Sequence, residues 1–251
     1  MKPKVFVYPD LEALSRVAAE EMVKVAQAAI EHRGRFSLVL SGGSTPRPLY
    51  RLLAKEQDRI RWDRVDLFWG DERHVSPDDP RSNYRMARET LLDHVPIPAE
   101  NIHPMPTDRP DPDETARDYQ ALLKDHFPKD WPRFDLVLLG MGADGHIASL
   151  FPGSSALDEK DRWVLAVRAP VEPPRRLTLT LPVFNHSSLI FVLVAGKVKA
   201  GALHRALAGP RDPKTSPAVG VQPAEGSVIW WTDEAAATFL GPAIRSPSTP
   251  V

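Results

Sequence analysis

The sequence predicts a three-layer α/β fold, in which an open, mostly parallel, Rossmann-like sheet carries helices on both faces. Short runs of Val, Ile, Leu and Phe alternate along the chain with longer stretches whose apolar residues recur at helical spacing. This alternation is expected when helices connect parallel strands. In addition, three of the apolar runs lead directly into polar, glycine-containing segments, which is typical of loops at the carboxyl ends of such strands.

Each predicted element follows from a local pattern between turn residues. After a first strand that ends at Tyr8, strands are predicted at 36–40, 65–69, 134–139, 163–167, 189–194 and 228–231. Helices are predicted at 11–31, through Leu49, Leu52 and Leu53, and at 84–92, 113–125, 198–208 and 233–239. We see no internal repeat or long linker, so we expect a single domain over 1–240 and a loose tail over 241–251.

Composition limits the function classes. The 251 residues carry a formal net charge of −1, with acidic and basic residues interspersed, so no nucleic-acid or membrane partner is expected. The chain has no cysteine, which excludes disulfides and thiolate chemistry. The apolar run before Pro9 is too short for a signal peptide or a membrane span. The expected compartment is the cytoplasm.

The segment Ser-Gly-Gly-Ser-Thr-Pro joins the strand at 36–40 to a helix. Gly42 and Gly43 allow a tight turn and a close approach to a ligand, and Ser44 or Thr45 can cap the helix before a proline in its first turn. Amides at a helix N-terminus attract phosphate. The segment is therefore either a phosphate-binding loop or an ordinary capped turn. It is not a P-loop, because the Gly-Lys-Ser/Thr ending is missing.

Gly140, Gly142 and Gly145 reproduce the Gly-x-Gly-x-x-Gly spacing of dinucleotide-binding loops. However, they lie in the middle of the chain, and Phe-Pro-Gly at 151–153 ends any helix after about one turn. The next predicted strand also lacks an acidic residue at its end, where a ribose contact is expected. We therefore do not interpret these glycines as a nucleotide site.

The same glycine-rich turn places Asp144 two residues before His146. Histidine suits general-base catalysis near neutral pH. The alternative is that Asp144 caps the turn and His146 is an ordinary loop histidine. The chain shows neither a histidine spacing typical of metal sites nor a Gly-x-Ser-x-Gly nucleophile motif, so no metal is expected.

Four further charged residues follow predicted strands or precede helices. Asp71 and Arg73 come after the strand at 65–69, where Asp71 can hold a sugar hydroxyl and Arg73 can bind phosphate or polarise a carbonyl. Arg176 and Lys199 can reach a phosphate from the same edge of the sheet. Asp71 and Arg73 can equally belong to a solvated loop with internal salt bridges, and a single Arg176 or Lys199 is more often a surface charge.

Taken as an ordered set, these motifs resemble the 6-phosphogluconolactonases, which share a superfamily with glucosamine-6-phosphate deaminase. The motifs are Leu-Ser-Gly-Gly-Ser-Thr-Pro at 40–46, Phe-Trp-Gly-Asp-Glu-Arg at 68–73, Ser-Asn-Tyr at 82–84, Gly-Met-Gly-Ala-Asp-Gly-His at 140–146 and Ala-Ser-Leu-Phe-Pro-Gly at 148–153. The resemblance extends through 176–180 and 199–200, and so covers nearly the whole chain.

The resemblance implies hydrolysis of 6-phospho-D-glucono-1,5-lactone to 6-phosphogluconate in the oxidative pentose phosphate route, with no metal or organic cofactor. His146 would activate water, with Asp144 orienting its imidazole or its loop, and a backbone amide or Arg73 would stabilise the oxyanion. The remaining matched positions are the phosphate-binding Ser44, Thr45, Arg176 and Lys199, and the site-lining Arg73 and Asn83.

Two alternatives remain. The deaminase resembles this chain around Asp-Gly-His but has a glutamate five residues after the histidine, where this sequence has Phe151. An apolar side chain cannot assist the staged proton transfers of ring opening, which favours the lactonase. A non-catalytic phosphosugar-sensing domain is the other alternative, although the candidate base is intact and no helix-turn-helix precedes the domain. The protein is expected to be a monomer or a small homo-oligomer.

Overall fold

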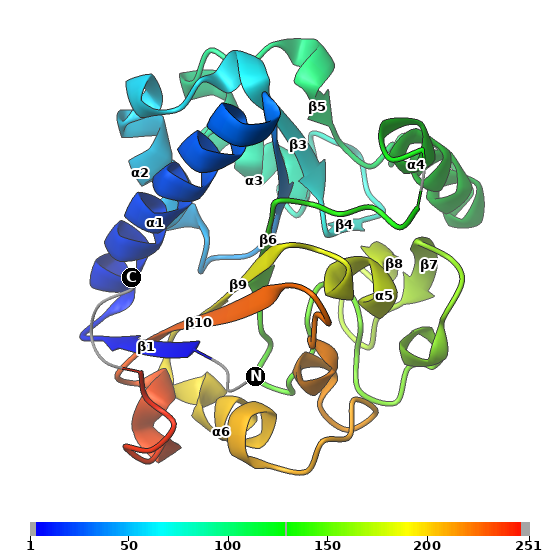
Figure 1. The fold of residues 1–251 in the computed structure, drawn as a ribbon. Helices are drawn as coiled ribbons and strands as arrows, with labels where there is room; N and C mark the ends of the chain where they lie inside the picture. Colours follow the sequence, from blue (N-terminus) through cyan, green and yellow to red (C-terminus); the bar gives the residue numbers. More distant parts are fainter. Residues whose placement is uncertain (1–3, 129, 247–251) are drawn as a thin grey trace.

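A parallel sheet of seven strands forms the middle layer of the computed structural model, which describes residues 4–128 and 130–246 (Figure 1). The sheet order is β1-β10-β9-β6-β2-β3-β5, and each neighbouring pair is parallel. The strands are β1 (Lys4–Tyr8), β2 (Phe36–Leu40), β3 (Val65–Trp69), β5 (Ile102–His103), β6 (Leu136–Gly140), β9 (Leu189–Val194) and β10 (Ser227–Asp233). The predicted open, mostly parallel sheet is thus confirmed.

Helices cover both faces of this sheet (Figure 1). One face carries α1 (Leu11–Arg33), α2 (Arg47–Lys55) and α3 (Asn83–Thr90), and the other carries α4 (Pro112–His126), α5 (Leu181–Asn185) and α6 (Ala200–Ala208). The reason is the direction of the connections. The chain moves toward β5 through the first three helices and toward β1 through the others, and right-handed crossovers then require opposite faces.

A second, antiparallel sheet of three strands lies beside the main one. Its order is β4-β8-β7, formed by β4 (Asp71–Arg73), β8 (Arg175–Leu179) and β7 (Val164–Arg168). The strand predicted at 163–167 therefore exists but does not join the parallel sheet. The sequence analysis missed β4 and β8, because β4 is short and charged and β8 begins with two arginines.

The core consists of the two faces of the main sheet and the helix surfaces packed on them. The side chains of Leu38, Val39 and Leu40 in β2 are fully buried, as expected for a strand covered on both faces. Asp10 caps the N-terminus of α1, because its carboxylate accepts a hydrogen bond from the amide of Ala13 at 2.8 Å. Among the described residues, no helix combines the length and the apolar character needed to cross a membrane.

Two predictions near the C-terminus need correction. The helix predicted at 233–239 is only a 3₁₀ turn at Ala236–Phe239, because Asp233 ends β10 and its carboxylate accepts from the amides of Gly196 and Ala236. The first part of the predicted loose tail is held against β1, since Ser246 exchanges hydrogen bonds of 2.7 and 2.9 Å with the main chain of Val5. Residues 247–251 of that tail lie outside the described residues.

The sheet order also indicates where a ligand binds. Strands β2 and β6 are neighbours, but the chain leaves β2 toward β3 and leaves β6 toward β9. Loops that depart in opposite directions from adjacent parallel strands open a crevice at their carboxyl ends. The two glycine-rich segments singled out in the sequence follow β2 and β6, so both border this crevice.

Candidate active site

A cavity of ≈ 220 Å³ lies where the loops after four adjacent strands meet. Its lining comes from the loops after β2, β3, β6 and β9, together with the start of α3. Cavities of ≈ 410 and ≈ 500 Å³ lie elsewhere, but the predicted site residues gather in this smaller one. The three glycine-containing segments that follow apolar runs in the sequence therefore meet at one cavity. The predicted site residues that line the cavity are Gly42, Gly43, Ser44, Thr45, Asp71, Arg73, Asn83, His146 and Lys199.

The loop after β2 is fixed at its first residue, Ser41. The buried hydroxyl of Tyr50, on α2, donates to the Ser41 carbonyl at 2.8 Å and accepts from the Ser41 amide at 2.9 Å. The Ser41 hydroxyl in turn accepts from the amide of Gly140, at the end of β6, at 3.2 Å. These bonds tie the two glycine-rich loops to each other and to α2. Sequence reasoning missed Tyr50, because its contact is visible only in the folded chain.

The structure explains why both positions 42 and 43 of this loop are glycine. Gly43 has a φ of +92°, a conformation that favours glycine. Gly42 packs against Asn83, and a Cβ at position 42 would lie 1.9 Å from the Asn83 Oδ1. The predicted cap is wrong: neither Ser44 nor Thr45 caps α2, because Pro46 occupies the N-cap position in helical conformation. The side chains of Ser44 and Thr45 therefore do not bond the amides at the start of α2.

Lys199 brings a positive charge to the same loop. Its Nζ donates to the Thr45 Oγ1 at 3.3 Å, which links the end of β9 to the loop after β2. The 3₁₀ turn Lys197–Lys199 is preceded by Gly196, whose amide donates to the Asp233 carboxylate. Burial lowers the pKa of Lys199, while Asp233 opposes this shift. A half-buried ammonium beside a loop with two glycines provides the components of a phosphate site.

His146 and Asp144 form a closely bonded pair in the loop after β6. The Asp144 Oδ1 lies 2.6 Å from the His146 Nδ1 and also accepts from the His146 amide at 3.1 Å. Burial raises the pKa of Asp144, but the bonds to His146 outweigh it and the pKa falls below its usual value. His146 lines the cavity, whereas Asp144 is exposed behind it. The carboxylate therefore orients the ring from outside the cavity.

The turn around this pair leaves little freedom. Gly142 donates to the His146 carbonyl at 2.9 Å, and a Cβ at position 142 would lie 2.2 Å from the His146 Nδ1. The ring of Phe151 packs on the other side, with its centroid 4.4 Å from that of the imidazole. No helix follows Gly145; the chain instead forms a bridge between Ile147 and Leu150. This agrees with the exclusion of a dinucleotide site.

Asp71 is buried at the bottom of the site and is already bonded. Its Oδ2 accepts from the Ser149 hydroxyl at 2.7 Å, and its Oδ1 and its carbonyl accept from the Asn83 Nδ2. Glu72 accepts from the amides of Arg73, Asn83 and Tyr84, and so fixes the start of α3. Glu72 and Ser149 were missed as site residues, although both lie inside motifs that the sequence analysis quoted.

The two arginines lie opposite each other in the ladder of β4 and β8. Arg73 lines the cavity, and its guanidinium donates to the Arg81 carbonyl at 2.6 Å. Arg176 is not among the residues that line the cavity, so its contact with phosphate stays a prediction. It is only 5% exposed, and its Nε donates to the Pro173 carbonyl at 2.6 Å because β8 turns it toward that loop. Burial, then the charge of Arg73, lowers the pKa of Arg176.

Comparisons with known proteins agree with this geometry. A family model described as glucosamine-6-phosphate isomerases/6-phosphogluconolactonase matches residues 9–230. The chain is 42% identical over 243 residues to the 6-phosphogluconolactonase of Nostoc sp., covering 96% of this chain and 99% of that protein. It is 41% identical over 247 residues to the 6-phosphogluconolactonase of Mycobacterium tuberculosis, with coverage of 96% and 99%.

Solved structures share the fold. The 6-phosphogluconolactonase of Trypanosoma brucei is 30% identical, with a TM-score of 0.85 and coverage of 96% of this chain and 99% of that one. A monomeric glucosamine-6-phosphate deaminase is 24% identical, with a TM-score of 0.78 and coverage of 94% and 99%. At that identity the deaminase shows a common fold and leaves the chemistry of this chain to be argued from its own residues.

Proposed function

The chain belongs to the glucosamine-6-phosphate isomerase/6-phosphogluconolactonase family, and on that premise we propose that it hydrolyses 6-phospho-D-glucono-1,5-lactone to 6-phosphogluconate in the oxidative pentose phosphate route. The observation that carries the proposal is that one cavity is lined by both His146 and the loop joined to Lys199. A single phosphorylated sugar can therefore touch an anion site and a base together. The close relatives named as lactonases, which match this chain over nearly their full length, support the same reaction.

The phosphate of the substrate docks at the loop after β2. Main-chain amides at the turn of Gly42 and Gly43 precede the N-terminus of α2, where an anion is favoured by the helix dipole. The Lys199 ammonium, 3.3 Å from the Thr45 hydroxyl, adds a charge-assisted contact. This anchor holds the six-membered lactone ring with its carbonyl carbon toward the loop after β6.

His146 is the general base. Asp144 accepts a hydrogen bond from Nδ1–H, which leaves the Nε2 lone pair of a neutral imidazole available for a water proton. As Nε2 takes that proton, the water oxygen attacks the lactone carbonyl carbon and the carbonyl oxygen becomes an oxyanion. Arg73 or a main-chain amide stabilises that charge. The ring C–O bond then breaks, and His146 returns the proton to the ring oxygen as it leaves.

The required acceleration is modest, because this activated ester already hydrolyses in water. A positioned general base contributes about 10²–10⁴-fold, and one oxyanion donor contributes about 10²–10³-fold. Together these two contributions raise the rate well above that of spontaneous hydrolysis, and no further catalytic group is needed.

The deaminase alternative is disfavoured by the surroundings of His146. Its imidazole packs against the Phe151 ring, with the ring centroids 4.4 Å apart, at the position where the resembling deaminase has a glutamate. Ring opening and loss of an amine need staged proton transfers, and an aromatic hydrocarbon ring cannot relay them. Water attack on an activated ester needs only one oriented base.

The test is to follow the proton released at neutral pH when fresh 6-phosphogluconolactone is hydrolysed with and without the protein. We expect decay well above the spontaneous rate, and a much smaller effect on the unphosphorylated lactone, which lacks the anchoring group. Ammonia released from glucosamine-6-phosphate, with no faster decay of the lactone, would reverse the assignment.

A further inference from the structure

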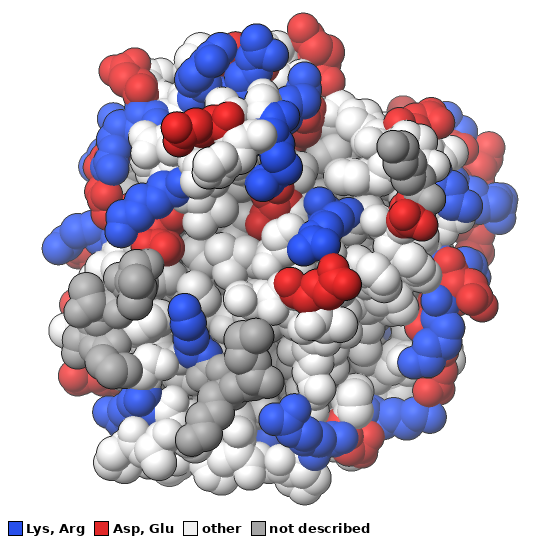
Figure 2. Space-filling view, in the orientation of Figure 1, with Lys and Arg blue, Asp and Glu red and all other residues white. Residues whose placement is uncertain are grey.

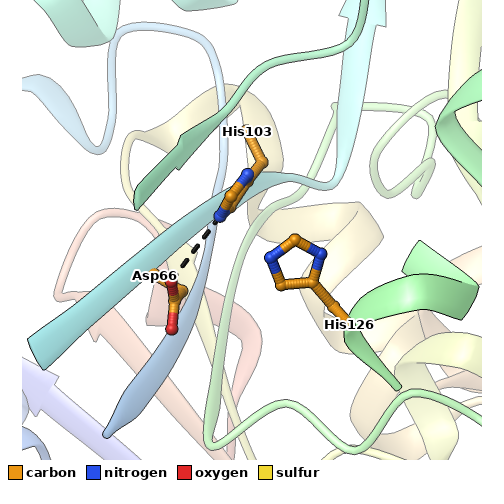
Figure 3. A group of neighbouring side chains, drawn as sticks. All are labelled: Asp66, His103 and His126. Atoms are coloured by element: carbon orange, nitrogen blue, oxygen red, sulfur yellow. Dashed lines mark ion pairs between the residues drawn. The ribbon is translucent and has the colours of Figure 1, made fainter. Parts of the chain in front are cut away.

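Three potential metal ligands from distant parts of the chain meet on the α4 side of the main sheet (Figure 3). They are Asp66 on β3, His103 on β5 and His126, the last residue of α4. One possible ligand atom from each lies within 4.8 Å of the others. Asp66 and His126 also line the cavity of ≈ 500 Å³, which shares no lining residue with the catalytic cavity.

His103 is the member that most needs a partner. The residue is only 8% exposed, and its buried Nε2 has no hydrogen-bond partner anywhere in the described chain. The Asp66 Oδ1 lies 3.6 Å from this nitrogen, which is within ion-pair distance but too long for a hydrogen bond. The ring is fixed by stacking on Phe68, with centroids 4.8 Å apart. A buried polar atom without a partner is rare and calls for an explanation.

His126 is held in the way that metal-binding histidines are held. Its Nδ1 lies 3.1 Å from the Leu122 carbonyl, so Nδ1–H donates to that oxygen and Nε2 keeps a free lone pair. In Figure 3 one nitrogen of its ring faces His103, and the two ring centroids are 4.3 Å apart. The side chain lies at an exposed helix end, where a rotation is easily accommodated.

Asp66 supplies a carboxylate that stays ionised. Its oxygens accept two bonds of 2.6 Å from Arg35. Burial raises the pKa of Asp66, but the contacts with His103 and Arg35 outweigh it and bring the pKa to about 2. A carboxylate has about four lone-pair positions, so Oδ1 can still face a cation beside His103. The charge of Arg35 reduces the affinity for that cation.

We propose that Asp66, His103 and His126 form a binding site for a first-row divalent transition metal, with Zn²⁺ the best fit. Two imidazoles and one carboxylate favour zinc and its neighbours over Mg²⁺ and Ca²⁺. Tetrahedral ligands at 2.0–2.1 Å from zinc lie about 3.4 Å apart. The three ligand atoms, now within 4.8 Å of one another, must therefore move closer together when zinc binds, and His126 is the residue that moves. The bound ion links the edge strand β5 to the end of α4 and does not take part in hydrolysis.

No metal was expected from the sequence, because the chain shows no histidine spacing typical of metal sites. These three residues lie on separate elements, and only the fold brings them together. His126 is the only one of the three on a helix, and that helix carries no second metal ligand one turn before it. The sequence therefore contains no metal-binding motif, although the folded chain brings three ligands together.

The test uses the full-length protein, stripped with a chelator and titrated with Zn²⁺ in competition with a chromogenic chelator. We expect the wild type to bind one equivalent, and His126→Ala to weaken that binding by at least about 100-fold, since it deletes one of three ligands. His186→Ala is the matched control: His186 is also exposed at a helix end, with Nδ1 2.7 Å from the Pro182 carbonyl four residues earlier. This control should bind like the wild type.

A spectroscopic measurement locates the ion. Titration with Co²⁺ should give visible absorption in the wild type and in His186→Ala, and none in His126→Ala. Because His126 lies outside the catalytic cavity, His126→Ala should hydrolyse the lactone like the wild type. The proposal fails if the wild type binds no Zn²⁺, if His126→Ala binds it equally well, or if binding disappears in His146→Ala instead.

Discussion

Gly142 leaves the space that the Asp144–His146 pair occupies, so an alanine there disturbs the pair without deleting either member. A Cβ at position 142 would lie 2.2 Å from the His146 Nδ1 and 2.6 Å from the Asp144 Oδ1. Favourable contacts between non-bonded heavy atoms lie at about 3.5–4.0 Å. The imidazole in Gly142→Ala must therefore move by more than about 1 Å.

This displacement gives the size of the expected effect. A misplacement of about 1 Å can cost about 100-fold in rate, which corresponds to about 2.7 kcal/mol in the activation barrier. Loss of the entire general base would cost at most about 10⁴-fold. We therefore expect kcat to fall between about 10²- and 10⁴-fold. KM should change little, because the groups around Lys199 and Thr45 are untouched.

The assay is proton release from the lactone at neutral pH, corrected for spontaneous hydrolysis, with a thermal melt to verify folding. Gly140→Ala is the matched control, because Gly140 lies only two residues earlier, at the end of β6, and its Cβ would meet only the Ser41 Oγ, at an ordinary 3.7 Å. Neither glycine has a positive φ, so alanine fits both backbones. Equal turnover by the two variants would refute the role assigned to the pair.

Three further predictions concern charge. Lys199→Ala should raise KM by about 10- to 100-fold, the cost of one charge-assisted contact, while kcat stays nearly constant; a fall in kcat at unchanged KM would place Lys199 in the chemical step instead. Since burial lowers the pKa of Lys199, binding of 6-phosphogluconate should weaken at alkaline pH before an ordinary lysine titrates, and Lys199→Arg should remove this dependence. For Asp66, the folded pKa of about 2 lies below the usual value of about 3.9, so its contribution to stability is present above about pH 4 and disappears toward pH 2. The melting temperatures of the wild type and Asp66→Asn should therefore converge as the pH falls through that range, and a constant difference would be incompatible with this shift.

The parts of the fold that the sequence predicted best are those that are buried on both faces. The runs at 36–40, 65–69 and 189–194 coincide with β2, β3 and β9, because a covered parallel strand is a continuous apolar run. The small sheet escaped prediction for the opposite reason. Strands β4 and β8 carry Asp71, Glu72, Arg73 and Arg176, whose burial depends on partners from other elements.

The same distinction applies to the site. The glycine-rich loops and His146 were predictable because loops after adjacent parallel strands converge. The supporting contacts were not, since the bond from Ser149 to Asp71 and the bonds of Tyr50 with Ser41 join residues that no local pattern relates. The hydrogen bond from the Arg176 guanidinium to the Pro173 carbonyl was also not predictable, and the contact of Arg176 with phosphate stays a prediction from the resemblance.

The most direct test measures turnover and ligand affinity on the same sample of His146→Ala. Since the base and the phosphate site lie in different loops of one cavity, turnover should fall by at least about 10²-fold, while the dissociation constant of 6-phosphogluconate stays within about threefold of the wild-type value. Turnover close to that of the wild type, or a loss of affinity as large as the loss of turnover, would contradict the account.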